Sequence, residues 1–266
     1  KLMFSIVCPT YNSSQYIDRC LKSILNQTYL PKEVIISDDG STDNTIQLVK
    51  NYNDKFLSKS ISLIIIEGDH NGPGEARNKG IYKAKENWIS FIDSDDDWEN
   101  NKLLKVYNYI TNNNSINAVL HWENYIKLDG TISKLPHGIN FVKDESLKKQ
   151  LYNENFFSTS ALTIKRKLLI NCNGFDNSFP NWQDYELWLR ISDKIKLGII
   201  KEVLGSYYEI SSSITNRPYW KKIKSNLRVW FRYKQEMDKK IILSKLLKIV
   251  FSKSWLYDLK KIFRWK

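Results

Sequence analysis

The sequence has few cysteines, no long apolar run and no leader pattern at its N-terminus. Its three cysteines, Cys8, Cys20 and Cys172, are widely spaced and outside any CxxC pattern, which favours buried thiols over a disulfide framework or a zinc site. No apolar stretch approaches the roughly 18 residues of a membrane span. The first residues, KLMFSIVCPTYN, lack the regions of a signal peptide. We therefore expect a globular protein of the cytoplasm.

The sequence also lacks an even distribution of charge. Residues 217–266 carry 12 Lys and 4 Arg against three acids, a net charge of +13, whereas the preceding 216 residues carry −1. With 42% hydrophobic residues, the chain can bury a sizeable core. We expect a near-neutral domain over residues 1–216 and a basic helical extension over residues 217–266.

Short runs rich in Ile and Val alternate with helical patterns in the first half of the chain. The runs are Phe4–Cys8, Glu33–Ser37, Ile61–Ile66 and Trp88–Ile92, and the helical patterns cover residues 14–26, 44–52 and 75–85. This alternation predicts an α/β fold with a mostly parallel central sheet flanked by helices. Ligands of such sheets bind beyond the carboxyl ends of the strands. The segments after the four runs are PTYN, DDGSTDNT, EGDHNGPGEARNKG and DSDDDW.

The segment WISFIDSDDDW, residues 88–98, places four carboxylates within five positions after an apolar run. An acid such as Asp97 or Glu99 could cap the helical pattern that follows, but one cap does not need four acids. Hard divalent cations prefer oxygen ligands, and Mg²⁺ or Mn²⁺ commonly takes one or two protein carboxylates together with phosphate oxygens and water. The segment therefore indicates a cation site.

Two other segments leave two interpretations open. Asp38 and Asp39 either belong to a turn with a helix cap at Ser41 or accept hydrogen bonds from a nucleotide. Arg77 lies near the start of a helical pattern, where the positive end of the helix dipole would repel a guanidinium, so we expect a separate anionic partner for it.

Five motifs in order, PTYN, DDGSTDNT, NGPGEARNKG, DSDDDW and QDYELWLR, together resemble the family 2 inverting glycosyltransferases with the GT-A fold. The resemblance covers about residues 4–210. It implies transfer of a sugar, with inversion, from a nucleotide-sugar such as a UDP-sugar to an acceptor hydroxyl. It also implies a divalent cation, Mn²⁺ or Mg²⁺.

The resemblance also implies roles for single residues. In the DxD pattern it implies Asp95 on the metal and Asp93 on the ribose or a metal-bound water, with Asp39 against uracil. The full donor-binding set is Pro9, Tyr11, Asp38, Asp39, Arg77, Asp93, Ser94 and Asp95. We expect Asp96 to support this site and Asp97 to be solvated.

The catalytic base is expected in QDYELWLR. The residues alone favour an ordinary helix in which Asp184 is a first-turn acid. In the resemblance, Gln183-Asp184 replaces the usual Glu-Asp pair, which gives Asp184 the role of base and Glu186 a secondary one. Many relatives have a further metal ligand, often histidine, after the base. The segment SYYEISSSITNRP, residues 206–218, contains none. We interpret His70, His121 and His137 as surface or satisfied side chains.

The basic extension raises the question of a partner. The pattern IILSKLLKIVF, residues 241–251, sets Ile242, Leu246, Ile249 and Val250 on one helical side and Lys245 and Lys248 nearer the other. We expect this amphipathic helix to bind an anionic membrane surface at the inner face of the cell membrane, near a lipid-linked or surface glycan acceptor. Alternatively, the apolar stripe packs on the domain.

Two other classes of function stay open. A nucleic-acid-binding protein could use the aromatic and basic residues of the extension, but this leaves the clustered acids unexplained, and we expect no nucleic-acid partner. A noncatalytic nucleotide- or sugar-binding protein of the same fold would not need the full set Asp39, Asp95 and Asp184.

Overall fold

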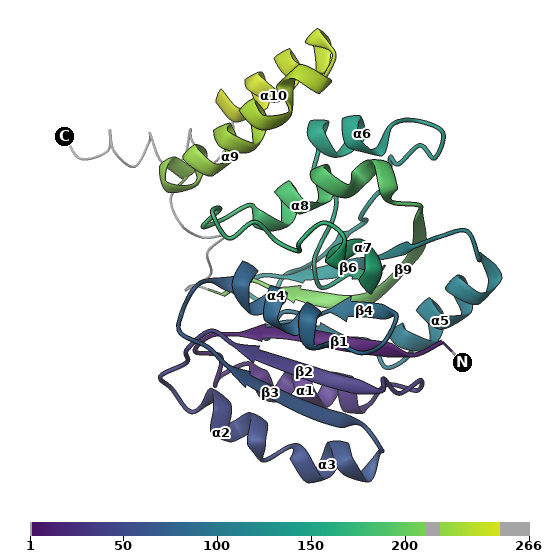
Figure 1. Cartoon of the computed structure of the whole chain (residues 1–266), viewed down its shortest axis with the longest axis vertical. Coiled ribbons are helices and arrows are strands. Elements are labelled where there is room, and N and C mark those ends of the chain that lie inside the picture. Colours follow the sequence, from purple (N-terminus) through teal and green to yellow (C-terminus); the bar gives the residue numbers. More distant parts are fainter. Residues whose placement is uncertain (1, 211–218, 251–266) are drawn as a thin grey trace.

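The computed structural model describes residues 2–210 and 219–250, and it shows one central sheet with helices on both faces (Figure 1). The strands are β1 (Phe4–Thr10), β2 (Glu33–Asp38), β3 (Ser62–Glu67), β4 (Trp88–Phe91), β5 (Asp97–Trp98), β6 (Ala118–Ile126), β7 (Ile132–Leu135), β8 (Leu162–Lys165) and β9 (Leu197–Tyr208). The helices are α1 (Ile17–Leu25), α2 (Thr45–Lys50), α3 (Asn53–Ser58), α4 (Pro73–Lys83), α5 (Lys102–Asn112), α6 (Leu147–Asn153), α7 (Arg166–Ile170), α8 (Gln183–Ile191), α9 (Tyr219–Tyr233) and α10 (Lys239–Val250).

The sheet has the strand order β3-β2-β1-β4-β8-β6-β9-β5, with β7 paired to β6. The four strands predicted from the apolar runs pair in parallel, β1 with β2 and β4, and β2 with β3. Beyond them the sheet is mixed, since β8 runs antiparallel to β4 and β6 while β9 runs parallel to β6. The predicted α/β class, with a central sheet between helices, is confirmed.

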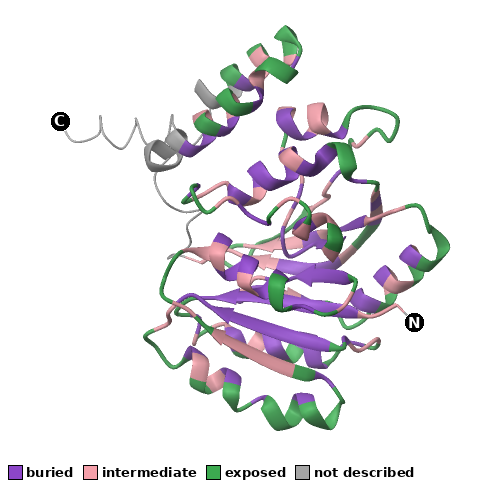
Figure 2. Ribbon diagram, in the orientation of Figure 1, coloured by how far each residue is buried: buried purple, intermediate pink, exposed green. Residues whose placement is uncertain are grey.

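Side chains that alternate along the parallel strands pack into two separate hydrophobic cores, one on each face of the sheet. In β1, Phe4, Ile6 and Cys8 face one side and Val7 faces the other, and all four are fully buried. The first side is covered by α1, α2, α3 and α5, and the second by α4 and α6 to α9. Figure 2 shows the resulting band of buried strands between partly exposed helices. Burial on both faces explains why these strands read as continuous apolar runs.

Helix α9 belongs to the second of these layers. Its residues Val229 and Tyr233, and Met237 just after it, are buried in the same core cluster as α8. The Tyr233 hydroxyl donates to Glu186 Oε1 at 2.9 Å, and Arg232 Nη1 donates to the same oxygen at 2.8 Å. The first part of the basic extension is therefore built into the domain core.

Helix α10 does not divide its side chains as the sequence predicted. Lys245, expected on the side opposite Ile242 and Leu246, is buried with its ammonium 5.0 Å from the centre of the Tyr185 ring. Leu246 is exposed, as are Leu243 and Leu247, whereas Ile242 is half-buried. The face of the Tyr185 ring attracts the ammonium, which favours the burial of Lys245.

Some of the sequence predictions fall outside these residues or are only partly met. The side chains of Lys248, Ile249 and Val250 and all of residues 251–266 lie outside the described part of the chain. Cys8 and Cys20 are buried free thiols as predicted, whereas Cys172 is half-buried. Within residues 2–210 and 219–250, every helix is too short or too polar to cross a membrane.

Candidate active site

The predicted site residues meet at one edge of the sheet, where β1, β2 and β4 end and α4 and α8 begin. The Thr10 hydroxyl at the end of β1 donates to Asp38 Oδ1 at 2.9 Å, and Arg77 of α4 contacts Asp93 after β4. Asp184 in the first turn of α8 interacts electrostatically with both Arg77 and Asp93. Segments as far apart in the chain as Thr10 and Asp184 therefore share one polar edge.

Asp38 organises the turn after β2. Its two oxygens accept hydrogen bonds from Thr10 Oγ1, from the backbone N–H groups of Gly40 (3.1 Å) and Ser41 (2.7 Å), and from the Ser41 hydroxyl (2.5 Å). Gly40 has a φ of +79°, which a residue without a side chain adopts without strain. A nucleotide contact of Asp38 would have to compete with these four donors, so the turn interpretation accounts for this residue.

Asp39 instead faces the loop that leads into α4. Oδ1 accepts from the backbone N–H of Asn71 at 2.8 Å and of Gly72 at 3.0 Å, and its side chain is 7% exposed. The ring of Tyr11, which is 45% exposed, lies beside it, stacked on the imidazole of His70. Gly72 has a φ of +95° and precedes Pro73, the first residue of α4. A buried acceptor next to an exposed aromatic ring is suited to a heterocyclic base with an N–H donor.

Arg77 has a protein partner for its charge. It is 7% exposed, and its Nη2 lies 2.5 Å from Asp93 Oδ1. Desolvation by burial is the largest single effect and lowers the pKa of Arg77, but the charge and hydrogen bond of Asp93 and the charges of Asp184 and Asp95 together outweigh it, so the pKa is raised. The anionic partner that the sequence required is therefore Asp93 in this structure, and Arg77 connects the acids after β4 to Asp184.

The acids after β4 differ in burial and charge. Burial, followed by the neighbouring Asp93 carboxylate, raises the pKa of Asp95 to about 6. Burial and then Asp95 raise the pKa of Asp96 well above its ordinary value. Asp96 is 1% exposed and accepts from the Ser160 hydroxyl at 2.5 Å, consistent with its predicted supporting role. Ser94 is buried, with its hydroxyl 2.7 Å from that of Ser13.

The expectation that Asp97 is merely solvated is wrong. Its Oδ2 accepts from the Tyr208 hydroxyl at 2.8 Å and lies 3.6 Å from Arg19 Nε. The Arg19 guanidinium stacks on the Tyr208 ring at 3.5 Å and also donates to the backbone carbonyl of Asp95. A cation from α1 and a phenol from β9 thus hold the end of the acidic segment.

Helix α8 separates the two acids that the sequence offered as bases. Asp184 is partly exposed at the site, where burial raises its pKa while a backbone hydrogen bond from Tyr185 and the charge of Arg77 oppose that rise. Glu186 is fully buried and is bound by Arg190, Arg232 and Tyr233. Because two positions along a helix point to different sides, Glu186 faces α9 and cannot act as the base.

Several contributors to the site were missed by sequence reasoning. They are Ser13, Arg19, His70, Ser160 and Tyr208, which lie 31 to 111 positions from the site residue that each contacts. Only His70, inside a segment already singled out, carried a usable signal. His70 is 60% exposed and its Nδ1 lies 3.2 Å from Asp39 Oδ2, so its interpretation as a surface or satisfied side chain is confirmed, although it lies within the site. His137 is satisfied by Glu123 at 2.8 Å, and His121 is buried with its Nδ1 2.8 Å from the Trp122 carbonyl oxygen, while its Nε2 has no hydrogen-bond partner among the described residues.

The acids fit a divalent cation with few protein ligands. In the described part of the chain no three or more His, Cys, Asp or Glu side chains are grouped so as to hold a metal ion. One or two hard oxygen donors remain, Asp95 and Asp93, in a place where burial and the neighbouring Asp93 carboxylate disfavour the charge of Asp95. Such a place gains most from a cation, and it leaves coordination positions for phosphate oxygens and water.

Comparisons with known proteins show what the chain is similar to. A family model described as "Glycosyl transferase family 2" matches residues 5–172. An uncharacterized glycosyltransferase of Haemophilus influenzae is 40% identical over 114 residues, 43% of this chain and 44% of that relative's own length. The amylovoran biosynthesis glycosyltransferase AmsB of Erwinia amylovora is 29% identical over 216 residues, covering 79% of this chain and 71% of AmsB.

The fold is also found among solved structures. Residues 1–349 of Staphylococcus aureus TarS, crystallised in complex with UDP, superpose with a TM-score of 0.72 at 20% identity. The superposition covers 97% of this chain and 75% of the TarS chain. The likeness therefore includes most of the helices and strands described above.

The raised pKa of Asp95 predicts a pH-dependent gain in stability for Asp95→Asn. With a folded-state pKa of about 6 and an ordinary value of 3.8, Asp95 costs the wild type stability above about pH 6. That cost disappears as the pH falls below 3.8, where both states are protonated. Without metal, we expect the variant to be more stable than the wild type by about 1 to 3 kcal/mol at pH 7.5, measured by urea unfolding, and equal to it near pH 3.5.

Asp97→Asn is the matched control, because it removes a neighbouring carboxylate that is paired with Arg19 and Tyr208. It should be no more stable than the wild type at any pH. A wild type that is as stable as Asp95→Asn at pH 7.5 in chelator would contradict the crowding of Asp93 and Asp95.

Proposed function

The chain belongs to glycosyl transferase family 2, and on this premise we propose that it transfers a sugar from a nucleotide-sugar, most suitably a UDP-sugar, to an acceptor hydroxyl with inversion at the anomeric carbon. The observation that carries the proposal is the meeting of Asp184 with Arg77 and Asp93 at one polar edge. A base, a cation and a metal-binding acid within one electrostatic cluster are the groups that such a transfer requires.

The proposed step is a direct displacement. Asp184 takes the proton of the acceptor hydroxyl while that oxygen bonds to the anomeric carbon, and the bond from this carbon to the diphosphate oxygen breaks. The electron pair of that bond leaves with the nucleoside diphosphate. Burial raises the pKa of Asp184 and so strengthens it as a base. Attack on the side opposite the diphosphate inverts the configuration.

Asp95 and Asp93 would hold a divalent cation, Mn²⁺ or Mg²⁺. When bound, the cation supplies charge neutralisation for the diphosphate of the donor and of the leaving group. Arg77, placed between Asp93 and Asp184, adds a positive charge on the same side. The neighbouring Ser94 stays buried and keeps the backbone of the acidic segment in place through Ser13.

The nucleoside end of the donor is assigned to the ends of β1 and β2. Asp39 would accept the N–H of a pyrimidine, and Tyr11 would stack on the ring, while Pro9 at the end of β1 is buried and shapes the wall. UDP is favoured because a uracil N–H suits a carboxylate acceptor. The UDP in the similar TarS structure is consistent with this choice.

We expect donor binding to need nucleotide and metal together. In a thermal-shift screen of UDP-, GDP- and CDP-sugars, a UDP-sugar with Mn²⁺ should raise the melting temperature, since selective binding stabilises the folded state by mass action. The same sugar in chelator should give a smaller shift. Stabilisation without any turnover, with a range of acceptors, would favour the noncatalytic binding protein instead.

Asp184→Asn should separate binding from chemistry. Loss of a general base should lower the transfer rate by about 10²-fold to 10⁴-fold, whereas the dissociation constant of the donor, measured by calorimetry, should change little. Glu186→Gln serves as the comparison, because Glu186 is buried against α9. Glu186→Gln should lower the free energy of unfolding, and its effect on the transfer rate of the molecules that remain folded should be the smaller of the two. Full turnover by Asp184→Asn would rule out the assigned base.

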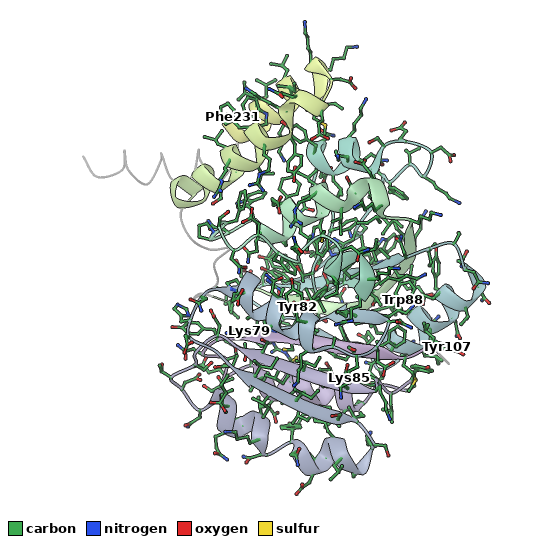
Figure 3. The ribbon with its side chains drawn as sticks, viewed as in Figure 1. Lys79, Tyr82, Lys85, Trp88, Tyr107 and Phe231 are labelled. Atoms are coloured by element: carbon green, nitrogen blue, oxygen red, sulfur yellow. The ribbon has the colours of Figure 1, made fainter. Side chains whose placement is uncertain are left out.

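The acceptor is proposed to be a lipid-linked or surface glycan, reached at the inner face of the cell membrane. Support comes from the net charge of +13 over residues 217–266 and from exposed apolar side chains on α9 and α10. Phe231 projects from α9 away from the sheet (Figure 3), and Leu243 and Leu247 of α10 are 57% and 47% exposed. Apolar side chains amid lysines suit the interface of an anionic leaflet.

Membrane binding is best tested without removing the extension, because α9 contributes to the domain core. The variant Leu243→Ser/Leu247→Ser should bind phosphatidylglycerol vesicles at least tenfold more weakly than the wild type in sedimentation, since each buried leucine contributes about 1.5 to 3 kcal/mol. Leu57→Ser, at a leucine of α3 that is 68% exposed, is the matched control and should bind normally.

Salt and lipid charge complete this test. Wild-type binding should weaken at high salt and with phosphatidylcholine vesicles, because each Lys or Arg near an anionic surface contributes on the order of 1 kcal/mol. Equal binding by the double variant and the wild type would reject the leucines as the contact surface. Salt-sensitive binding to nucleic acid with none to lipid would favour the nucleic-acid alternative.

A further inference from the structure

His70 occupies the position assigned above to the base of the donor. Its imidazole stacks on the Tyr11 ring, with ring centroids 4.1 Å apart and planes 25° from parallel. Its Nδ1 lies 3.2 Å from Asp39 Oδ2. The ring therefore makes both contacts that were assigned to uracil, the stacking on Tyr11 and the polar contact with the Asp39 carboxylate.

The loop that carries His70 is pressed against the end of β2. A side-chain carbon added at Gly68 would lie 2.8 Å from the Asp38 carbonyl oxygen, and one at Gly40 would lie 3.0 Å from the His70 backbone nitrogen. Both close approaches depend on glycine. His70 itself has a φ of +48°, in the left-handed region that residues with side chains rarely adopt. The loop thus holds the imidazole over Tyr11 despite an unfavourable backbone conformation.

The two rings leave no room for a third between them. Aromatic rings that sandwich a base lie about 7 Å apart, twice the contact distance of roughly 3.5 Å between carbons, whereas these rings are 4.1 Å apart. A base can stack on the face of Tyr11 that the imidazole covers only after His70 has moved. Asp39 Oδ2, whose other partner is the backbone N–H of Gly72 at 3.0 Å, then becomes available to it.

We propose that His70 is a built-in competitor of the nucleotide base, which closes the base-binding site until the donor displaces it. The proposal rests on the proposed function, since it takes Tyr11 and Asp39 as the place of the base. The apparent affinity for the nucleotide is lowered by the fraction of molecules in which the imidazole is in place. His70 thereby sets the affinity and pH dependence of donor binding without touching the reacting atoms.

The strength with which the imidazole closes the base-binding site should depend on whether the histidine is protonated. Histidine changes its charge near neutral pH, and an imidazolium would bind the Asp39 carboxylate more tightly than a neutral ring. The other groups near His70 are the Tyr11 phenol, the exposed neighbour Asp69, and the Lys79 ammonium beside Gly68. Histidine is the residue type among these that gains a proton near neutral pH, so we expect nucleotide binding to weaken as the pH falls from 8 to 6.

The test compares UDP binding by the full-length wild type with that by three variants, by calorimetry in chelator at pH 6 and pH 8. His70→Ala should bind UDP roughly threefold to tenfold more tightly than the wild type at pH 6, and the gain should be smaller at pH 8. His70→Phe keeps a ring but cannot titrate, so its affinity relative to His70→Ala should be the same at both pH values. Asp69→Ala, an exposed neighbour in the same loop, should resemble the wild type.

Chelator removes bound metal, so metal occupancy does not differ among the four proteins. The acids proposed to bind metal are the same in all four, so their protonation cancels when the UDP affinities are compared as ratios. Weaker binding by His70→Ala would overturn the proposal, because the ring would then be a clamp on the base. Equal UDP affinity of His70→Ala and the wild type at both pH values would overturn the proposal as well. Absence of UDP, GDP and CDP binding by all four folded proteins, with and without Mn²⁺, would instead overturn the proposed function on which it rests.

Discussion

Repulsion between the carboxylates at the end of β4 is the constraint around which this edge of the molecule is organised. Arg77 of α4 pairs with Asp93 at one end of the acidic segment, and Arg19 of α1 lies against Asp97 at the other. Asp95 lies between them with a pKa raised to about 6. The two arginines offset part of the repulsion and leave part of it for a bound cation to relieve, so metal binding and folding stability are linked.

Helix α8 connects helix α9 of the basic extension to the candidate active site. Glu186 and Asp184 are two positions apart and face different sides of the helix. Glu186 is fully buried and binds Arg232 and Tyr233 of α9, while Asp184 lies beside Arg77. A buried carboxylate that lost these donors would be strongly destabilising. The orientation of the proposed base therefore depends on a helix that the charge distribution alone had assigned to a separate extension.

The fold could be predicted where both faces of a strand are buried. β1 to β4 are continuous apolar runs, and their parallel pairing followed from the alternation with helices. The strands from β6 onward are partly exposed and carry polar side chains, as in Ala118–Ile126, so no periodic pattern distinguished them. Their mixed parallel and antiparallel pairing is set by contacts with β4 and with each other, which the sequence does not display.

By itself the sequence determined which segments end at the polar edge, because strand ends are local features, and its resemblance to a family pointed to Asp39, Asp95 and Asp184 within those segments. Tertiary structure decided the partners of these acids: Arg19, 76 positions before Asp95, and the ring of His70 over Tyr11. It also decided that Lys245 is buried and Leu246 exposed. Charge compensation and ring stacking act over a few ångströms between distant segments, and only the packed chain brings those segments together.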